Sequence, residues 1–142
     1  MITVSDLQRQ LYFSAGINTD VNKVWATGEK IVFPYLISNV GDGYDVSTGI
    51  FTAPFDGVYL FTCFLASHTD KFKADLVVNG MPKVGIPAIA TSGSHGHFGA
   101  AGNALPVALV SGDRVWIQYV AGSVIWTYSR APYSTFSGYL IA

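Results

Sequence analysis

Charged residues are scarce in this chain of 142 residues. Lysine and arginine number 8, aspartate and glutamate number 9, and together they make up 12% of the sequence. An average soluble domain carries about 25% charged residues. The net charge of -1 offers no basic excess that could neutralise phosphates, so nucleic acid is not an expected partner. A surface with so few charges predicts that another chain or a ligand covers part of it.

Long apolar runs are absent as well. The apolar stretches have the length of strands, and no cluster of Lys or Arg suggests a contact with anionic lipid, so we expect no membrane insertion. The segment Met1–Asp6 lacks the apolar core of a signal peptide, and the sequence has no Asn-x-Ser/Thr site for N-glycosylation. Secretion would therefore require a leader removed before Met1 or another route out of the cell.

The chain has a single cysteine, Cys63, which excludes a disulfide within the chain. Cysteine content alone fits the cytosol as well as the cell exterior. Cys63 lies in the most apolar run of the sequence, with no charged neighbour that could stabilise a thiolate. We therefore expect a buried, reduced, structural thiol rather than a nucleophile.

Helix signals are nearly missing too. Only Ser5–Leu11 could form a helix, and it is too short to be stable alone. The remaining chain alternates short apolar runs with Gly, Pro, Asn and Asp, which is typical of an all-β sandwich or barrel. Pro34 predicts an edge or a bulge, and Asn79–Gly80 a hairpin turn. The expected strands are residues 11–15, 30–37, 49–51, 57–66, 73–78, 104–110, 114–120, 123–128 and 136–141, with turns at 111–113 and 121–122.

Two stretches are expected to form long loops. One is Asn18–Gly28, which is polar around Trp25, and the other is Ala90–Gly102, which is rich in Gly, Ala, Ser and His. Loops carried by a rigid sandwich are where binding residues usually lie. The sequence shows neither an internal repeat nor a collagen-like Gly-x-y run.

A spaced series of residues between Phe33 and Phe64 resembles the signature of the C1q globular-head family. Cys63 departs from it, because the family has Phe or Tyr there, with Phe64 one place late. The segments 47–54, 78–80, 112–116 and 134–140 also resemble family landmarks, so the likeness covers about residues 13–142. The signature positions filled in register are Phe33, Asn39, Tyr44, Phe51, Gly57, Tyr59 and Phe61.

The resemblance implies a fold and an assembly. The fold would be a two-sheet antiparallel jelly-roll sandwich of the C1q and tumour-necrosis-factor type, assembling as a homotrimer. The chain would be one domain over residues 1–142, with 1–10 as a short N-terminal extension. Gly57, which follows a turn-like pair, is expected to have a positive φ. Large side chains on strand-like segments are expected in the core, namely Phe33, Phe51, Tyr59, Phe61, Trp116 and Phe136.

The resemblance also suggests functions. Without a collagen stem, the chain is similar to head-only secreted members from invertebrates such as molluscs. Those imply a secreted lectin-like protein of innate immunity that recognises glycans or lipopolysaccharide-like microbial ligands. The alternative is a structural or signalling trimer that binds a protein receptor. A matrix or biomineral protein would need acidic clusters, which the sequence lacks.

Aromatic and basic residues are the candidates for ligand binding. Trp25 stands in a polar loop, where an exposed ring could stack on a sugar. In the run 126–130 the alternation places Trp126 and Tyr128 on one face, and Arg130 would suit an acidic sugar or a sulfate. The alternative for these rings is packing in the core or in a trimer interface.

Histidines and acids give little support for a metal or for catalysis. His95 and His97 share a face of an extended chain and could bind a metal or ligand, but a metal site needs further ligands; the alternative is a polar loop. Calcium occurs in several family heads, yet Ala90–Gly102 has no acid to hold it. Asp42–Asp45 reads as a turn. No catalytic motif is present, so we predict no enzyme, no cofactor and no metal.

Overall fold

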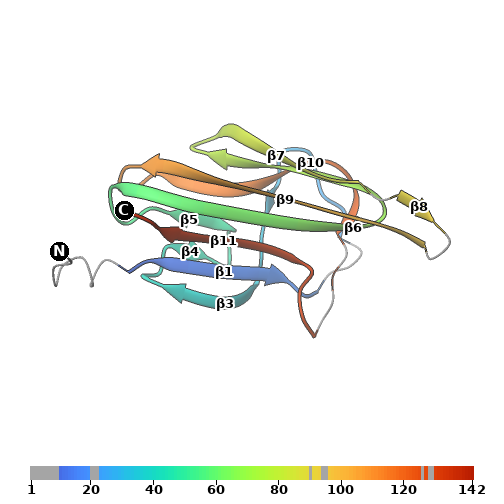
Figure 1. Ribbon diagram of the computed structural model, residues 1–142, viewed down its shortest axis with the longest axis horizontal. Coiled ribbons are helices and arrows are strands. Elements are labelled where there is room, and N and C mark those ends of the chain that lie inside the picture. The colour runs from blue at the N-terminus through green and yellow to red at the C-terminus, as the bar shows by residue number, and fades with distance from the viewer. Residues whose placement is uncertain (1–9, 20–22, 90, 94–95, 126, 128–129) are drawn as a thin grey trace.

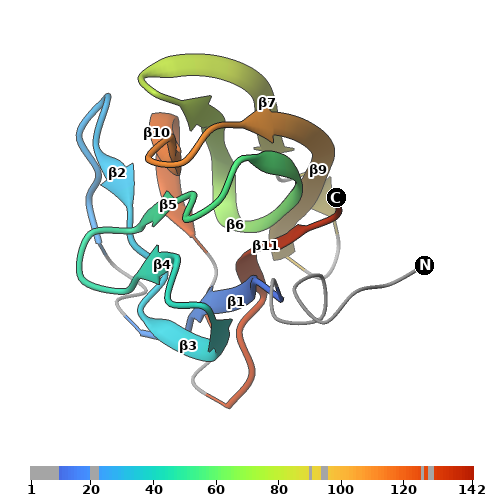
Figure 2. The same ribbon diagram turned by 90° about the vertical axis from the view of Figure 1, so that its left-hand side faces the viewer.

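The structure is a computed structural model that describes residues 10–19, 23–89, 91–93, 96–125, 127 and 130–142. This part of the chain contains strands, turns and irregular segments and no helix. The strands, labelled in Figure 1 except for β2, which is labelled in Figure 2, are β1 (Tyr12–Ile17), β2 (Lys30–Ile31), β3 (Tyr35–Val40), β4 (Tyr44–Asp45), β5 (Ile50–Thr52), β6 (Gly57–Val78), β7 (Met81–Ile89), β8 (Thr91–Gly93), β9 (Gly96–Leu109), β10 (Arg114–Ile125) and β11 (Ser134–Leu140).

The strands form two antiparallel layers around a common interior, as the view along the strands in Figure 2 shows. The first layer has the order β3–β1–β11–β6–β9, and β8 pairs with the start of β9. The second layer combines β7, the later part of β6, β10 and the short strands β2, β5 and β4. Strand β6 serves both layers, because residues 57–68 pair with β9 and residues 71–78 pair with β7. The predicted all-β, two-sheet jelly roll is confirmed.

Large aromatic side chains fill the space between the layers. The rings of Phe13 and Tyr44 stack with their centroids 4.8 Å apart, and Phe136 meets Phe13 edge-on at 4.9 Å. Fully burying one such side chain contributes roughly 1.5–3 kcal/mol. The expected core positions Phe33, Phe51, Tyr59, Phe61 and Phe136 are all fully buried, as predicted.

Trp116 is buried but lies outside the main core. It packs with Ile50 and Val77 in a separate small cluster. Its chain neighbours Val115 and Ile117 point into the main core. Because alternate residues of a strand face opposite sides, Trp116 lies on the outer side of the second layer. The prediction of burial is correct, and the predicted place in the sandwich core is wrong.

Three expected strand boundaries differ in the structure. The expected strand 30–37 is divided into β2 and β3 at Pro34, which has no N–H to donate to a ladder. The expected strands 57–66 and 73–78 are one strand, β6, which continues from one layer into the other. Residues 121–122 form no turn. They lie within β10, where Gly122 has a φ of +117° and the pairing with β6 shifts register, so they form a bulge.

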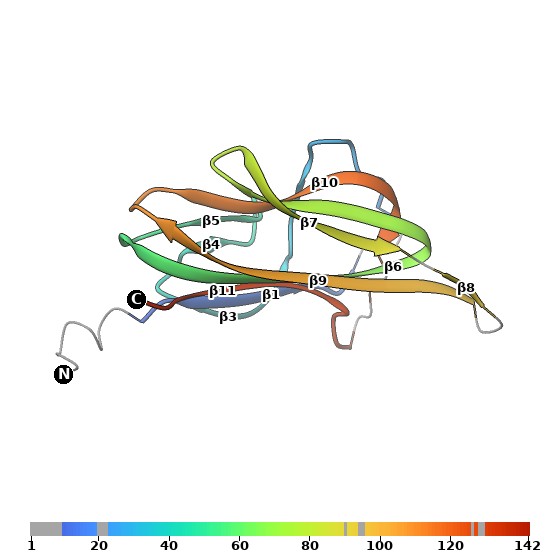
Figure 3. The same cartoon turned by 45° about the horizontal axis from the view of Figure 1, so that its top comes forward.

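The second expected loop is also wrong. Residues 91–93 and 96–102 belong to β8 and β9, whose pairing forms a hairpin that projects beyond the rest of the sandwich (Figure 3). The loop 18–28 is confirmed where it is described, since residues 18, 19 and 23–28 lie outside the strands.

Strand β7 was not expected, because Pro82 and Pro87 interrupt its pattern. It pairs with β6 alone, and such an edge strand tolerates proline.

Glycine is required at two positions for different reasons, a turn at Gly80 and a close approach of the chain at Gly57. Asn79 and Gly80 have φ values of 50° and 86°, so the hairpin turn predicted from Asn-Gly is confirmed. Gly57 is not among the residues with positive φ, which contradicts the expected reason for a glycine there. A Cβ on Gly57 would lie 2.6 Å from the carbonyl oxygen of Ala142. The position needs a glycine because the C-terminus passes too close for any side chain.

Candidate functional site

The outer face of the first layer carries no charged side chain among the described residues. Its residues alternate with the buried core residues along β1, β11, β6 and β9. The pairing brings Tyr12 beside Tyr139, and Tyr139 beside Leu60. A shallow groove of about 510 Å³ follows the β1–β11 edge of this face. We call these residues the uncharged face: Tyr12, Ser14, Gly16, Val58, Leu60, Thr62, Phe64, Gly102, Ala104, Pro106, Ala108, Thr135, Ser137 and Tyr139.

Phe64 is the most prominent apolar residue of the uncharged face. Its side chain is 52% exposed although it lies in an inner strand of the layer, β6, between β11 and β9. The ring lies over Gly102 of β9, where a Cβ would come within 2.1 Å of it. A glycine at 102 thus lets the ring lie flat on the sheet, and one side of the ring stays open to another molecule.

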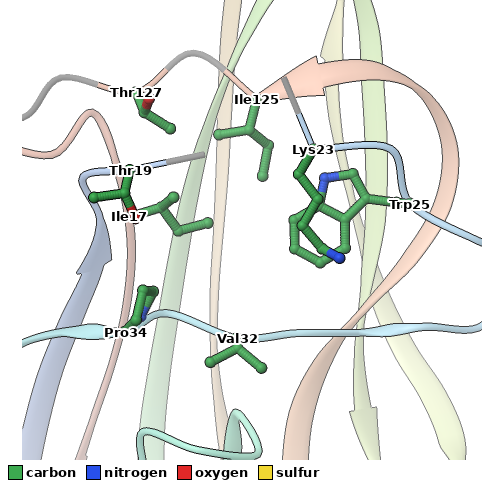
Figure 4. A pocket seen from close by; sticks show the side chains of 8 residues that line it. All are labelled: Ile17, Thr19, Lys23, Trp25, Val32, Pro34, Ile125 and Thr127. Carbon is green, nitrogen blue, oxygen red and sulfur yellow. The ribbon is translucent and has the colours of Figure 1, made fainter. Parts of the chain in front are cut away.

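A small pocket lies at the end of the sandwich where β1 and β10 finish. Eight residues line it: Ile17, Thr19, Lys23, Trp25, Val32, Pro34, Ile125 and Thr127. Its volume is about 30 Å³. In Figure 4 Trp25 and Lys23 form one side and Ile17, Thr19 and Thr127 the other, with Val32 and Pro34 below. We call it the loop-end pocket, because Thr19, Lys23 and Trp25 of the loop 18–28 line it.

Trp25 is half-buried in the wall of this pocket. Its ring stacks on Tyr119 with centroids 6.4 Å apart and meets Phe72 edge-on at 6.2 Å. The ammonium of Lys23 lies 4.6 Å from the centre of the ring. The polar sequence around Trp25 predicted a freely exposed ring, and this expectation is wrong, because the residue packs against the core. Part of the side chain still borders the loop-end pocket.

Thr127 places an unpaired hydroxyl at the same pocket. Its side chain is only 8% exposed, and its Oγ1 has no hydrogen-bond partner. Leaving such a buried group unpaired costs about 1–3 kcal/mol. An unpaired hydroxyl on a pocket wall is a group that a ligand could satisfy. Sequence reasoning missed Thr127, although the alternation of 126–130 had already set it on the face opposite Trp126 and Tyr128.

The rim of the loop-end pocket carries a paired charge. Lys23 Nζ lies 3.0 Å from Glu29 Oε2, and the Ala26 N–H donates to Glu29 Oε1 at 3.0 Å. The hydrogen bond from Ala26 and the contact with Lys23 lower the pKa of Glu29 below its usual value. The carboxylate is therefore ionised at neutral pH, and the pair leaves the rim with no net charge.

Basic side chains cluster on the side of the molecule opposite to the uncharged face. The outer face of the second layer and its edges carry five of the 8 basic residues and, among described side chains of its strands, two acids, Asp45 and Asp75. None of the five forms a salt bridge with a described side chain. We call this surface the basic wall, formed by Lys30, Lys71, Lys73, Lys83 and Arg114.

The other candidate ligand residues are placed only in part. Arg130 is exposed and does not line the loop-end pocket. Trp126, Tyr128 and His95 lie outside the described residues. His97 lies in β9 and pairs with Ser92, but its side chain is not described. Of these candidates only Arg130 has a described side chain, and it does not share a pocket with Trp25.

The described residues include the single thiol, the acids of the segment 42–45 and other possible metal ligands. Cys63 is buried and reduced, as predicted, and burial raises the pKa of its thiol. The turn expected at 42–45 is only partly present: Asp42, with a φ of 53°, lies in a bend, whereas Tyr44 and Asp45 form β4, and Asp45 Oδ1 accepts the Ser47 N–H at 2.8 Å in the turn that follows. No three His, Cys, Asp or Glu side chains of the described residues are grouped in a way that could hold a metal ion. The described residues also include no helix long and apolar enough to cross a membrane.

Sequence comparisons place the chain among known proteins. The model of a family described as "C1q domain" matches residues 12–141. Complement C1q tumor necrosis factor-related protein 3 of Mus musculus is 30% identical over 134 residues, which are 93% of this chain and 51% of that protein. Caprin-2 of Danio rerio is 33% identical over 115 residues, which are 80% of this chain and 12% of that protein. The chain thus spans about half or less of these curated relatives.

Solved structures give the same fold. The globular domain of zebrafish complement 1qA protein has a TM-score of 0.73 at 23% identity, covering 94% of this chain and 98% of that chain. The Eiger TNF of S. frugiperda has a TM-score of 0.71 at 16% identity, covering 94% of this chain and 93% of that chain. The jelly roll is therefore the one that C1q and TNF domains share. With the family model matched over residues 12–141 and this fold, the chain belongs to the C1q domain family.

Proposed function

We propose that the chain is a secreted, non-enzymatic recognition domain that assembles as a homotrimer and binds glycans, including lipopolysaccharide-like microbial ligands. The domain comprises residues 1–142, with 1–10 as an N-terminal extension. Membership of the C1q family supports a binding role and a trimer. The finer statements rest on two surfaces of this chain, the uncharged face and the loop-end pocket.

The uncharged face supports the trimer. Exposed Tyr12, Phe64 and Tyr139 lie on one sheet surface with small neutral residues between them, and no charge interrupts it. A continuous apolar surface of this kind is unfavourable in water and usually marks an interface. The charged residues of the basic wall lie on the other layer, where a trimer built through the uncharged face would leave them in solvent.

Two matched variants test this part of the proposal. Phe64→Lys places a charge on the uncharged face, whereas Ile89→Lys places one on β7 of the second layer; the two side chains are 52% and 53% exposed. We expect wild type and Ile89→Lys to sediment with three times the mass of one chain, and Phe64→Lys to sediment as a monomer. A monomeric wild type, or a trimeric Phe64→Lys, would contradict the assignment.

The loop-end pocket is the observation that carries glycan binding. It offers the edge of an aromatic ring from Trp25, the hydroxyls of Thr19 and Thr127, and a rim whose charges are paired. Sugars present apolar C–H faces beside hydroxyl and amide groups, so a mixed site with few charges suits them. The pocket lies at the end away from the C-terminus, because β1 finishes there beside Ser134 of β11.

A glycan array tests this part. Wild-type protein should bind a defined subset of glycans above background, and Thr19→Ala, at the exposed rim, should weaken that binding while leaving the melting temperature unchanged. An Ala substitution at exposed Thr52, in β5, is the matched control and should bind as wild type does. Absence of binding to every glycan at trimer concentrations that saturate related lectins would overturn glycan recognition.

The second candidate is binding to a protein receptor, which the basic wall favours. Five cations that form no salt bridge with a described side chain suit an acidic protein face, and such binding would weaken steeply with salt. The double variant Lys71→Glu with Lys73→Glu should abolish receptor binding and leave glycan binding intact. If the double variant still binds the receptor and instead loses glycan binding, the basic wall is not the receptor surface.

A further inference from the structure

We propose that the loop-end pocket binds the acetamido group of an N-acetylated sugar. The inference rests on the proposed glycan binding and names the ligand class for that same site. It depends on four observations: the volume of the pocket, its apolar floor, the unpaired hydroxyl of Thr127 and the neutral rim.

The volume limits the ligand to a small group. A cavity needs roughly 10–15 Å³ of such volume to hold one water molecule. At about 30 Å³ the loop-end pocket holds two or three non-hydrogen atoms, and a sugar ring cannot enter it. The pocket therefore takes the acetyl part of the substituent, which has three non-hydrogen atoms, while the amide nitrogen and the sugar ring stay outside, beside the rim residues Thr19 and Lys23.

The walls match the two halves of an acetamido group. Ile17, Val32 and Ile125 give the pocket an apolar lining that suits a methyl group. Burying that methyl removes apolar surface from water, which a hydroxyl substituent would not do. Thr127 belongs to the same lining, and its Oγ1 has no hydrogen-bond partner among the described residues. A hydroxyl can donate a hydrogen bond, so it can pair with the carbonyl oxygen of the acetyl group.

The charges at the rim favour a neutral group. The ammonium of Lys23 is held by Glu29 at 3.0 Å and lies over the ring of Trp25. It is thus not free to pair with a carboxylate or sulfate without losing those contacts. Glu29, in turn, is occupied by Lys23 and by the Ala26 N–H, so an ammonium on the ligand gains no free carboxylate. An uncharged amide can bind without pairing with the charge of Lys23 or of Glu29.

Three tetrasaccharides with one backbone test the proposal. Chitotetraose, its fully deacetylated form and cellotetraose share β-1,4-linked glucose units and differ only in the substituent at C2: acetamido, ammonium and hydroxyl. Calorimetric titration of the wild-type protein should show chitotetraose binding at least about tenfold more tightly than either of the others, the range expected for one apolar group in a fitted pocket. Equal affinities would overturn the proposal.

Variants of Thr127 separate binding from structure. Thr127→Val keeps the shape of the side chain and removes the unpaired hydroxyl, so its melting temperature should equal or exceed that of wild type while the preference for chitotetraose falls about tenfold. Thr127→Ser retains the hydroxyl and should retain the preference. Thr52→Val is the control at an exposed threonine of β5 and should behave as wild type.

The outcomes distinguish this inference from the proposed function. Binding to other glycans on the array without a preference for chitotetraose overturns the acetamido assignment and leaves glycan recognition intact. Absence of all glycan binding overturns both. A Thr127→Val protein that is less stable than wild type, with its preference unchanged, would show that Thr127 is a packing residue and contradict its role in the pocket.

Discussion

Tyr44 supports a part of the chain that no strand ladder supports. Residues 32–34 lie between β2 and β3 and form no strand. Within this gap the Phe33 N–H donates to Tyr44 Oη at 3.0 Å, and Tyr44 Oη donates to the Phe33 carbonyl at 3.1 Å. One phenol thus satisfies both backbone groups of Phe33, which is itself fully buried in the core.

Tyr44→Phe should be strongly destabilising although it removes a single oxygen atom. The variant leaves a buried N–H and a buried C=O without these partners, at a cost of about 1–3 kcal/mol each, partly offset by easier burial of the ring. We expect a loss of about 2–4 kcal/mol. For a chain of this length that corresponds to a melting temperature lower by about 8–16 °C.

The same hydroxyl predicts a dependence on alkaline pH. Burial, with smaller effects from Asp45 and Cys63, raises the pKa of Tyr44 to about 12, against the opposing hydrogen bond with Phe33. In the unfolded chain the pKa is about 10. A raised pKa stabilises the fold fully below about pH 10, and that contribution is lost as pH rises toward 12. The difference in stability between wild type and Tyr44→Phe should therefore shrink by roughly 1.4 kcal/mol per pH unit across that window.

The measurement is urea unfolding of both proteins at one protein concentration, since assembly makes stability depend on concentration. The range from pH 8 to about pH 11 covers the onset of the effect. Tyr35→Phe, on an exposed tyrosine of β3, is the control and should match wild type throughout. A Tyr44→Phe protein as stable as wild type, or a difference that stays constant above pH 10, would refute the reasoning.

Four further predictions follow from single features of the molecule. Cys63→Ala should cost about 1–2 kcal/mol and leave glycan binding unchanged, and rapid labelling of the native thiol would contradict its burial. Trp25→Ala should lower the melting temperature and also weaken glycan binding by roughly 1–3 kcal/mol, so an unchanged melting curve would contradict its packing against the core. Glycan binding should survive a chelator, because residues 90–102 contain no acid; loss of binding that calcium restores would refute this. Deleting residues 1–9 should leave the melting temperature within about 2 °C, and a larger fall would extend the domain into that segment.

The core was predictable because large aromatic side chains on the strands of a sandwich are usually buried between the two sheets. Phe33, Phe51 and Phe136 lie on short strand-like segments, and each is fully buried. Trp116 shows the limit of this argument. Residues 115–119 are mostly apolar on both faces, so the sequence does not tell which face meets the core. The outer cluster of Trp116 depends on Ile50 and Val77, which come from other strands.

It was harder to predict where a strand continues than to predict that a strand is present. Gly122 follows an apolar run and precedes another, which is the usual pattern of a turn. In the structure a Cβ at this position would lie 2.1 Å from the carbonyl oxygen of Lys71. The glycine permits a bulge pressed against β6, and β10 continues past it. Only the neighbouring strand distinguishes such a bulge from a turn, and a single sequence does not contain that information.

The loop-end pocket could not be predicted from local sequence because Ile125 and Thr127, which help to line it, lie far along the chain from its other residues between Ile17 and Pro34. Trp25 looked exposed since its sequence neighbours are polar, but Phe72 and Tyr119 of the second layer pack against it. The ring therefore contributes to stability and to the pocket wall together, and Trp25→Ala changes both. A fall in binding by that variant alone would not identify a ligand contact. Thr127 separates the two effects, because its hydroxyl has no partner among the described residues and its removal leaves the packing in place.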